Sequence, residues 1–370
     1  MSKPLKLKSE HGIVCRVPGG KFGYFGWPTV ARHEDGTLIV ASSGLRTEHV
    51  CPWGKTVLNF SHDDGRTWSA PRVINDSPLD DRDAGVVCLG GPRLLVTWFT
   101  SDTRPYRRSE WCRAWAERDN WDAVLGGCTD EVVRKWLGSW IMLSDDKGKT
   151  WGPPLRAPVS TPHGPVRMAN GDLLYLGRPM GPDVKIEAST AEAWRSSDGG
   201  KTWAEQGRVP AAAGAQVMNN EEPHVIELPG GRLAGMLRFE MRGGDDPAGK
   251  AGHEAFSIYQ TDSGDGGKTW SVPRALGISG SPPHLVRHSS GVLVMTYGYR
   301  KAPFGQRVAF SRDNGATWEH DWIIRDDGPD SDLGYPSTVE MADGSMFTVC
   351  YQKAAGDEKC SLLWSRWTMP

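Results

Sequence analysis

The sequence lacks any long apolar run. Its first residues, Met1-Ser2-Lys3-Pro4, contain no apolar signal core, and no later stretch approaches the length of a membrane span. We therefore expect no membrane partner and, unless a leader has been removed, a cytoplasmic location. An excess of one charge is also lacking, since 43 Lys and Arg residues face 45 Asp and Glu residues. Without clustered positive charge, we expect no nucleic-acid partner.

Cysteine is sparse as well. The seven cysteines are odd in number and scattered along the chain, which favours reduced thiols over a disulfide framework. No Cys-x-x-Cys pair occurs, and the histidines do not show the spacing of a metal site. We therefore predict no metal and no other cofactor.

Tryptophan, by contrast, is abundant, and five of its 17 copies end the octet S-x-D-x-G-x-T-W. An apolar run precedes each octet. In such an octet Asp can bind backbone N–H groups and Gly can supply a positive φ, which predicts a tight turn between two strands. Because five equivalent copies cannot share one site, the octet is interpreted as structural. The complete copies are Ser61–Trp68, Ser144–Trp151, Ser196–Trp203, Ser263–Trp270 and Ser311–Trp318.

A second repeat joins two apolar segments through a Gly turn, and it occurs six times along the chain. Together the two repeats define six units of about 60 residues, each with four strands. We therefore predict an all-β fold, a six-bladed β-propeller that forms one domain over residues 1–370. The sixth unit has no octet, and its third strand is expected at Lys359–Trp364. An N-terminal strand near Leu5–Arg16 is expected to close that last blade.

One insertion interrupts the second unit at about residues 102–135. It carries Trp111, Trp115 and Trp121 among charged residues, and its pattern is partly helical. We interpret it as a flap packed on blade two; the alternative is that it also lines a ligand pocket.

The topology of a propeller selects candidate site residues. In each blade, the octet is expected to join the third strand to the fourth at one face of the propeller. The opposite face then carries the starts of the first strands and the loops between the second and third strands. The starts of the first strands supply Trp27, Asp83, His163, Glu221 or Glu222, and Tyr335. The loops supply Arg46, His49, Lys55, Arg178, Arg238, Arg300 and Arg307. Carboxylates, a tyrosine and arginines in one place predict a site for an anionic ligand.

The octets resemble the Asp-boxes, or BNR repeats, of the sialidase (neuraminidase) superfamily, and the resemblance extends over nearly the whole chain. It implies a six-bladed β-propeller and an exo-acting glycoside hydrolase that removes a terminal acidic sugar. The motif is specific for the fold and not for the activity, because Asp-boxes also occur in lyases, in other glycosidases and in propellers without enzymatic activity.

Sialidases use a tyrosine nucleophile, a glutamate that activates it, an aspartate acid/base and three arginines that grip the substrate carboxylate. The segment Asp332–Ser337 resembles the nucleophile segment and implies that Tyr335 is the nucleophile. The segment Asn220–Leu228 resembles the glutamate segment and implies Glu222 as base, with Glu221 as the alternative, and Arg238 as a carboxylate clamp. Arg300 and Arg307 compete for the third arginine. Arg46, Lys55, Arg82, His163 and Arg178 are further candidate substrate contacts.

Two positions depart from the family pattern. Gly26-Trp27-Pro28 stands where the family has Arg-Ile-Pro, so the first arginine is absent. The position of the acid/base aspartate, counted back from Ser61, is occupied by His49. A histidine can perform acid–base chemistry near neutral pH. Asp83 is the competing acid, although the neighbouring Arg82 is expected to lower its pKa and thus to favour a binding role.

The leading hypothesis is hydrolysis of a terminal sialic acid, a related keto-sugar acid or a uronic acid. Two alternatives remain open. One is a different glycosidase or a polysaccharide lyase with His49 as the central acid/base. The other is a propeller without enzymatic activity that binds a glycan or a protein. This alternative would be favoured if Tyr335 and Glu222 did not lie within hydrogen-bond reach of each other.

Overall fold

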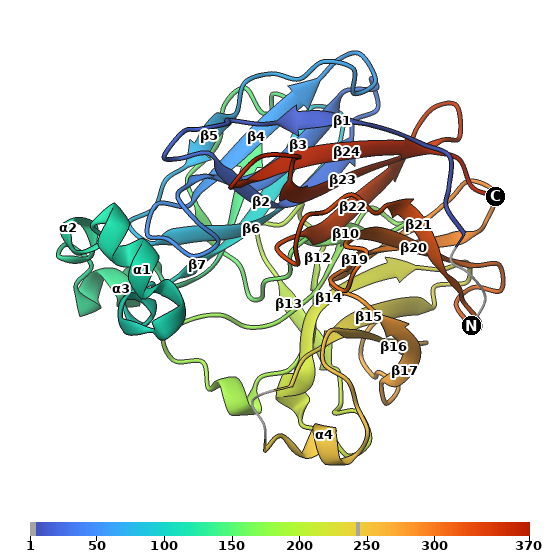
Figure 1. Cartoon of the computed structure of the whole chain (residues 1–370). Coiled ribbons are helices and arrows are strands. Elements are labelled where there is room, and N and C mark those ends of the chain that lie inside the picture. Colours follow the sequence, from blue (N-terminus) through green and yellow to red (C-terminus); the bar gives the residue numbers. More distant parts are fainter. Residues whose placement is uncertain (1–4, 242–244) are drawn as a thin grey trace.

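The computed structural model describes residues 5–241 and 245–370; the first four residues, in which a signal core was sought, lie outside this range. Six four-stranded antiparallel sheets are arranged around a central axis (Figure 1). The predicted all-β, six-bladed β-propeller is therefore confirmed. Most neighbouring blades contact one another through their first strands, which places these strands at the centre of the ring.

Each blade uses consecutive strands, apart from the last. Blade one contains β2 (Tyr24–Arg32), β3 (Leu38–Arg46), β4 (Lys55–Ser61) and β5 (Arg72–Asn75), and blade two contains β6 (Asp80–Gly90), β7 (Arg93–Ser101), β8 (Gly138–Ser144) and β9 (Leu155–Arg156). Blade three contains β10 (Val166–Arg167), β11 (Leu173–Gly177), β12 (Glu192–Ser196) and β13 (Ala204–Arg208). Blade four contains β14 (Asn220–Glu227), β15 (Leu233–Phe239), β16 (Ser257–Ser263) and β17 (Arg274–Ser279), and blade five contains β18 (Pro283–Arg287), β19 (Leu293–Tyr299), β20 (Gly305–Ser311) and β21 (Glu319–Arg325).

Blade six is completed from the N-terminus, as predicted. Its strands are β22 (Gly334–Glu340), β23 (Met346–Lys353), β24 (Cys360–Trp367) and β1 (Ser9–Cys15), in the order β1-β24-β23-β22. The strand β24 starts one residue later than expected and continues to Trp367. Since β1 continues directly into blade one, the chain itself ties the first blade to the last.

The five octets each join the third strand of a blade to the fourth. In the copy that follows β20, Asp313 accepts hydrogen bonds from Ser311 Oγ at 2.7 Å and from the backbone N–H of Thr317 at 2.9 Å. The N–H of Gly315 donates to Ser311 Oγ at 2.8 Å, and Gly315 has a φ of 88°. The other four octets repeat this network around Asp63, Asp146, Asp198 and Asp265. The octets thus mark one face of the propeller, and the loops between second and third strands lie at the other.

The insertion between β7 and β8 is helical (Figure 1). It contains the 3₁₀ helix η1 (Pro105–Arg108) and the helices α1 (Glu110–Asp119), α2 (Asp122–Leu125) and α3 (Asp130–Trp136). Cys112, Ala116 and Trp121 of the insertion pack against Val50 and Cys51. The insertion is therefore anchored to the β3–β4 loop of blade one, although it belongs to blade two.

Short helices also occur in blades three and four: η2 (Ile186–Ala188), η3 (Val217–Asn219) and α4 (Pro247–Lys250). No helix among the described residues is long and apolar enough to cross a membrane.

Candidate active site

Four of the first strands share a backbone irregularity at the same height in the propeller. The register shifts within β2, β6, β14 and β22, just where each strand starts. At each shift a residue other than glycine has a positive φ: 54° at Trp27, 49° at Asp83, 40° at Glu222 and 50° at Tyr335. Bulges of this kind redirect a side chain, and the left-handed conformation costs about 1–3 kcal/mol per residue. Strain repeated in four blades therefore marks the candidate site.

Tyr335 and Glu222 meet across the ring. The hydroxyl of Tyr335 donates a hydrogen bond to Glu222 Oε1 at 2.5 Å, although 113 residues separate them. Tyr335 is buried, and burial together with the nearby Glu222 raises its pKa well above the usual value for a phenol. At neutral pH the phenol therefore keeps its proton and holds it against a carboxylate that can accept it.

Arg238 lies between two carboxylates. Its Nη1 donates to Glu222 Oε2 at 2.8 Å, and its Nη2 donates to Glu240 Oε2 at 2.6 Å. Much of its hydrogen-bonding capacity is thus used by Glu222 and Glu240 together. Arg300 is different: its guanidinium carbon lies 5.9 Å from the Tyr335 ring centre, and its buried Nε has no hydrogen-bond partner. Arg300 and Phe256 line a cavity of about 300 Å³. Arg300 is therefore the arginine best placed to bind an anionic group of a ligand.

Asp83 lies close to Tyr335 and Glu222, because the Glu222 carboxylate helps to raise the pKa of Asp83 and Asp83 helps to raise the pKa of Tyr335. Burial raises the pKa of Asp83 to about 7, and Arg82 only partly opposes this effect. The expectation that Arg82 would hold the pKa of Asp83 low was therefore wrong, because the loss of hydration outweighs the neighbouring positive charge. With its Oδ1 buried and unpartnered, Asp83 can carry a proton at neutral pH and donate it to a ligand.

His49 forms a pair with Asp332 that the sequence did not reveal. Its Nδ1 lies 2.9 Å from Asp332 Oδ1, and the hydroxyl of Tyr24 donates to the same oxygen at 3.0 Å. Burial lowers the pKa of His49 despite the opposing effect of Asp332. Burial also acts to raise the pKa of Asp332, but the hydrogen bonds from His49 and Tyr24 outweigh it and set the pKa at about 2. With the Nδ1 proton held by this carboxylate, Nε2 of His49 remains for proton exchange.

Trp27 occupies the floor beneath His49. It is 1% exposed, and its ring centre lies 5.0 Å from that of His49 and 6.4 Å from that of Tyr335. The guanidinium carbons of Arg82 and Arg46 lie 4.2 and 4.8 Å from the ring centre of Trp27. Gly26, and not Trp27, occupies the position of the family's first arginine, and two other arginines lie over the ring of Trp27.

Several predicted substrate contacts have other partners in the structure. Arg46 is fully buried and makes two hydrogen bonds to the carboxylate of Asp80, at 2.5 and 2.8 Å, so no face of it is left for a ligand. Arg82 donates to the backbone oxygen of His49 at 3.1 Å. The prediction that Arg46 contacts the substrate is therefore corrected, because Arg46 is a buried structural residue. Arg82 lies next to His49.

The remaining candidates contact other residues. Lys55 pairs with Asp76, Arg178 pairs with Glu221, and Arg307 packs its guanidinium 4.3 Å from the ring centre of Tyr299. These contacts favour Glu222 over Glu221 as the partner of Tyr335, and Arg300 over Arg307 as the arginine of the site.

His163 is 3% exposed and belongs to a cluster at the axis of the ring. Its ring centre lies 4.8 Å from that of His284 and 5.7 Å from that of His224. We therefore assign His163 to this axial cluster and not to the substrate contacts. Among the residues that the structure describes, no group of three or more His, Cys, Asp or Glu side chains is arranged to hold a metal ion.

Sequence reasoning missed Asp332, Tyr24 and Glu240. Asp332 stands three residues before Tyr335, so a search for polar groups near the start of each first strand would have included it. A proline follows Trp27, Glu222 and Tyr335 directly, and this recurring pair was a signal that would have separated Glu222 from Glu221.

Comparisons with known proteins agree with this architecture. The family described as "BNR repeat-like domain" matches residues 124–348, which is more than half of the chain. No curated protein matches the sequence. A solved structure of a protein of unknown function from Dyadobacter fermentans is 22% identical, with 98% of each chain covered and a TM-score of 0.76.

Two solved glycosidases share the fold at lower identity. The intramolecular trans-sialidase from Ruminococcus gnavus is 14% identical, with 97% of each chain covered and a TM-score of 0.66. An alpha-L-arabinofuranosidase from Fusarium graminearum is 15% identical, with 98% of each chain covered and a TM-score of 0.63. At these identities the likeness shows the fold alone.

Proposed function

Because the chain belongs to the BNR repeat-like domain family and has the sialidase-superfamily fold, we propose that it is an exo-acting glycoside hydrolase. Its substrate is a glycoconjugate or oligosaccharide that ends in an acidic sugar, either sialic acid or a related sugar acid. The observation that carries the proposal is the 2.5 Å hydrogen bond between Tyr335 and Glu222. A phenol held against a carboxylate is the pairing that a tyrosine nucleophile needs.

In the first step, the Tyr335 oxygen attacks the anomeric carbon as the bond to the leaving oxygen breaks. The phenolic proton passes to Glu222, which Arg238 holds in position. His49 gives its proton to the leaving oxygen. In the second step, His49 takes a proton from water, the water oxygen attacks the anomeric carbon, and Glu222 returns the proton to the departing Tyr335 oxygen.

His49 is assigned the acid/base role because its side chain is 23% exposed, whereas Asp83 is 6% exposed. A leaving group must depart towards solvent, so the residue that protonates it lies near the exposed rim. Asp83, protonated below about pH 7, donates a hydrogen bond to the bound sugar. Asp83 remains the competing acid, and the pH dependence of kcat/KM in His49→Asn and in Asp83→Asn separates the two roles.

The preference for an acidic sugar rests on Arg300, whose buried Nε has no partner in the protein. A guanidinium binds a carboxylate with planar, paired hydrogen bonds. With Gly26 in place of one arginine, the grip on the carboxylate relies on Arg300 and Arg238. The trans-sialidase of similar fold was solved with oseltamivir carboxylate, which supports an anionic ligand for this architecture.

The proposal is tested by a screen of the purified protein against a panel of sialosides, other keto-sugar acid glycosides and uronic acid glycosides. We expect release of the acidic sugar from at least one compound and loss of this activity in Tyr335→Phe. Tyr106→Phe, which changes a half-exposed tyrosine of the insertion, is the matched control. Full turnover by Tyr335→Phe would refute the nucleophile, and glycan binding without turnover would favour a binding protein.

A second candidate is elimination from a uronic acid by a polysaccharide lyase that uses His49 as base. It is favoured by the lowered pKa of His49, which leaves the imidazole neutral and able to accept a proton. The products separate the two functions, because elimination leaves an unsaturated uronic acid that absorbs in the ultraviolet and hydrolysis does not.

A further inference from the structure

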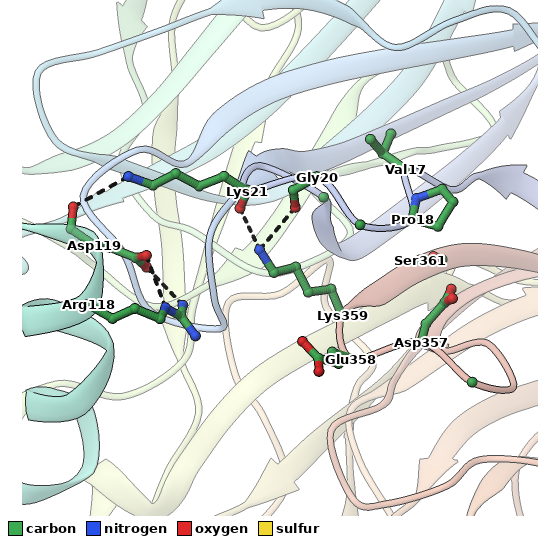
Figure 2. A pocket seen from close by; sticks show the side chains of 13 residues that line it. Val17, Pro18, Gly20, Lys21, Arg118, Asp119, Asp357, Glu358, Lys359 and Ser361 are labelled. Atoms are coloured by element: carbon green, nitrogen blue, oxygen red, sulfur yellow. Dashed lines mark hydrogen bonds and ion pairs between the residues drawn. The ribbon is translucent and has the colours of Figure 1, made fainter.

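A second, larger cavity lies next to the His49 loop. It has a volume of about 640 Å³ and lies between residues 17–23, the end of α1 and the loop before β24 (Figure 2). Figure 2 shows Lys359 reaching across to the N-terminal loop, where its Nζ donates to the backbone oxygen of Gly20 at 3.1 Å. Arg118 and Asp119 of α1 form the facing wall.

Two short links connect this cavity to the His49–Asp332 pair. On one side, Arg118 pairs with Glu48 at 2.7 Å, and Glu48 directly precedes His49. On the other side, Cys360 Sγ lies 3.1 Å from the backbone oxygen of Asp332, and Cys360 stands between two residues that line the cavity. The cavity is therefore linked on two sides to the pair that includes His49, the proposed acid/base.

An exposed tryptophan at the start of α1, the helix whose last turn lines this cavity, packs against His49. Trp111 is 55% exposed, and its ring centre lies 5.9 Å from that of His49 and 5.4 Å from that of Trp115. Residues 111, 115 and 118 recur at the spacing that places side chains on one stripe of a helix. This stripe of α1 thus runs from His49 to the wall formed by Arg118, and α1 is anchored by its packing on Val50 and Cys51.

The chemistry of the cavity fits a neutral saccharide. Three positive side chains in its lining are balanced by three negative ones, so the cavity offers many donors and acceptors without a net charge. A sugar presents hydroxyls that both donate and accept, and an apolar face that can pack on an indole. The charged side chains that line the cavity are Lys21, Arg118, Asp119, Asp357, Glu358 and Lys359.

We propose that Trp111 and this cavity form the leaving-group subsite, which binds the neutral sugar units on the far side of the cleaved bond. The inference rests on the proposed hydrolysis and adds the substrate class: an acidic sugar on an oligosaccharide of at least two further units, in preference to one on a small alcohol. Trp111 determines specificity and takes no part in proton transfer.

The test compares kcat/KM for two probes, the most active oligosaccharide of the panel and the methyl glycoside of the same acidic sugar. Trp111→Ala is expected to lower kcat/KM about tenfold for the oligosaccharide, and less than about twofold for the methyl glycoside. Trp111→Phe keeps an aromatic face and is expected to recover part of the loss. Arg113→Ala, an exposed change elsewhere on α1, is the matched control and should alter neither value.

An equal loss for both probes, or no loss for either, would overturn the subsite. If the wild type cleaves nothing, the proposed function fails, and the subsite is then judged by binding of the same oligosaccharides. Weaker binding by Trp111→Ala than by the wild type would support it. Equal binding by both proteins, or no binding by the wild type, would refute it.

Discussion

The reactivity of Tyr335 depends on a single partner. Burial and the neighbouring carboxylate raise the pKa of this phenol, so it cannot lose its proton to water at neutral pH. Glu222 Oε1 is the atom that receives the Tyr335 hydrogen bond, while Glu222 Oε2 is held by Arg238. The nucleophile is therefore activated only when attack and proton transfer occur together.

Glu222→Gln keeps the shape of this side chain and removes its ability to accept the proton. We expect kcat to fall by about 10²–10⁴, the usual contribution of a positioned general base. Steady-state kinetics on the best substrate of the panel measures the effect. The neighbouring Glu221→Gln, which alters the partner of Arg178, is expected to cost much less; equal losses would contradict the assignment of Glu222.

Asp332 acts through His49. Its carboxylate favours the charged imidazole, so Asp332→Asn is expected to lower the pKa of His49 further below its usual value. As the acid, His49 must be protonated, and activity is lost as the pH rises through its pKa. The falling limb of the kcat/KM profile should therefore move to lower pH in Asp332→Asn. Asp330→Asn, which removes the partner of Lys353, should leave that limb in place, and an unmoved limb in both variants would exclude His49 as the acid.

For single residues, the sequence predicted which side chains form the site better than it predicted their pKa values. Tyr335 and Glu222 followed from repeat position, because equivalent residues of successive blades converge on the axis. The pairing of His49 with Asp332 joins residues that are 283 positions apart, and no local pattern records it. The pKa of Asp83 was misjudged because Arg82 is visible in the sequence, whereas the extent of burial is not.

The octet turns and the bulged first strands lie at opposite ends of the blades and have different roles. The octets hold the outer hairpins by hydrogen bonds within each turn and leave the site untouched. The bulges at Trp27, Asp83, Glu222 and Tyr335 place strained residues at the other end of the blades. The octets were predictable because Asp, Gly and Thr have defined roles in turns. The positive φ of four larger residues was not, since their sequence preferences oppose it.

Asp313→Ala removes the acceptor that holds the turn between β20 and β21. Its hydrogen bonds from Ser311 and Thr317 are lost, which we expect to lower the free energy of unfolding by about 1–3 kcal/mol. Urea denaturation followed by tryptophan fluorescence measures this change. Because the octet lies on the face opposite the site, kcat should stay within about twofold of the wild-type value; a large loss of kcat at unchanged stability would contradict a purely structural role.

At the scale of the whole molecule, the site exists only when the ring is closed. His49 comes from blade one, Asp83 from blade two, Glu222 from blade four, Arg300 from blade five and Tyr335 from blade six. The strand β1 joins blade six to blade one, and the His49–Asp332 pair bridges the same two blades. The number of blades and the closing strand were predictable from repeats; the helical insertion was located by composition, but its docking on blade one required the structure.

The axial histidines should make the stability of the ring depend on pH. Burial lowers the pKa of His163 and His284 well below the usual value, and lowers that of His224 to about 3. The unfolded chain therefore binds more protons than the folded one below about pH 6.5. Stability present above that pH is expected to be lost as the pH falls towards 3.

His224→Asn can retain an acceptor for the backbone N–H of Leu285. It removes one of the imidazoles that take up a proton when the chain unfolds in acid. The slope of the unfolding free energy against pH, between about pH 6 and 4, should decrease by up to about 1.4 kcal/mol per pH unit. The exposed His62→Asn serves as control. A slope that changes equally in both variants would contradict the role of the axial cluster.

The proposed mechanism requires that Tyr335 form a covalent bond to an acidic sugar. It is tested most directly by incubating the protein with a fluorinated analogue of the accepted sugar, which slows hydrolysis of the intermediate, and by mass spectrometry of the proteolytic peptides. We expect one added sugar mass on the peptide that contains Tyr335, and none in Tyr335→Phe. Steady turnover with no adduct, or an adduct on another residue, would contradict it.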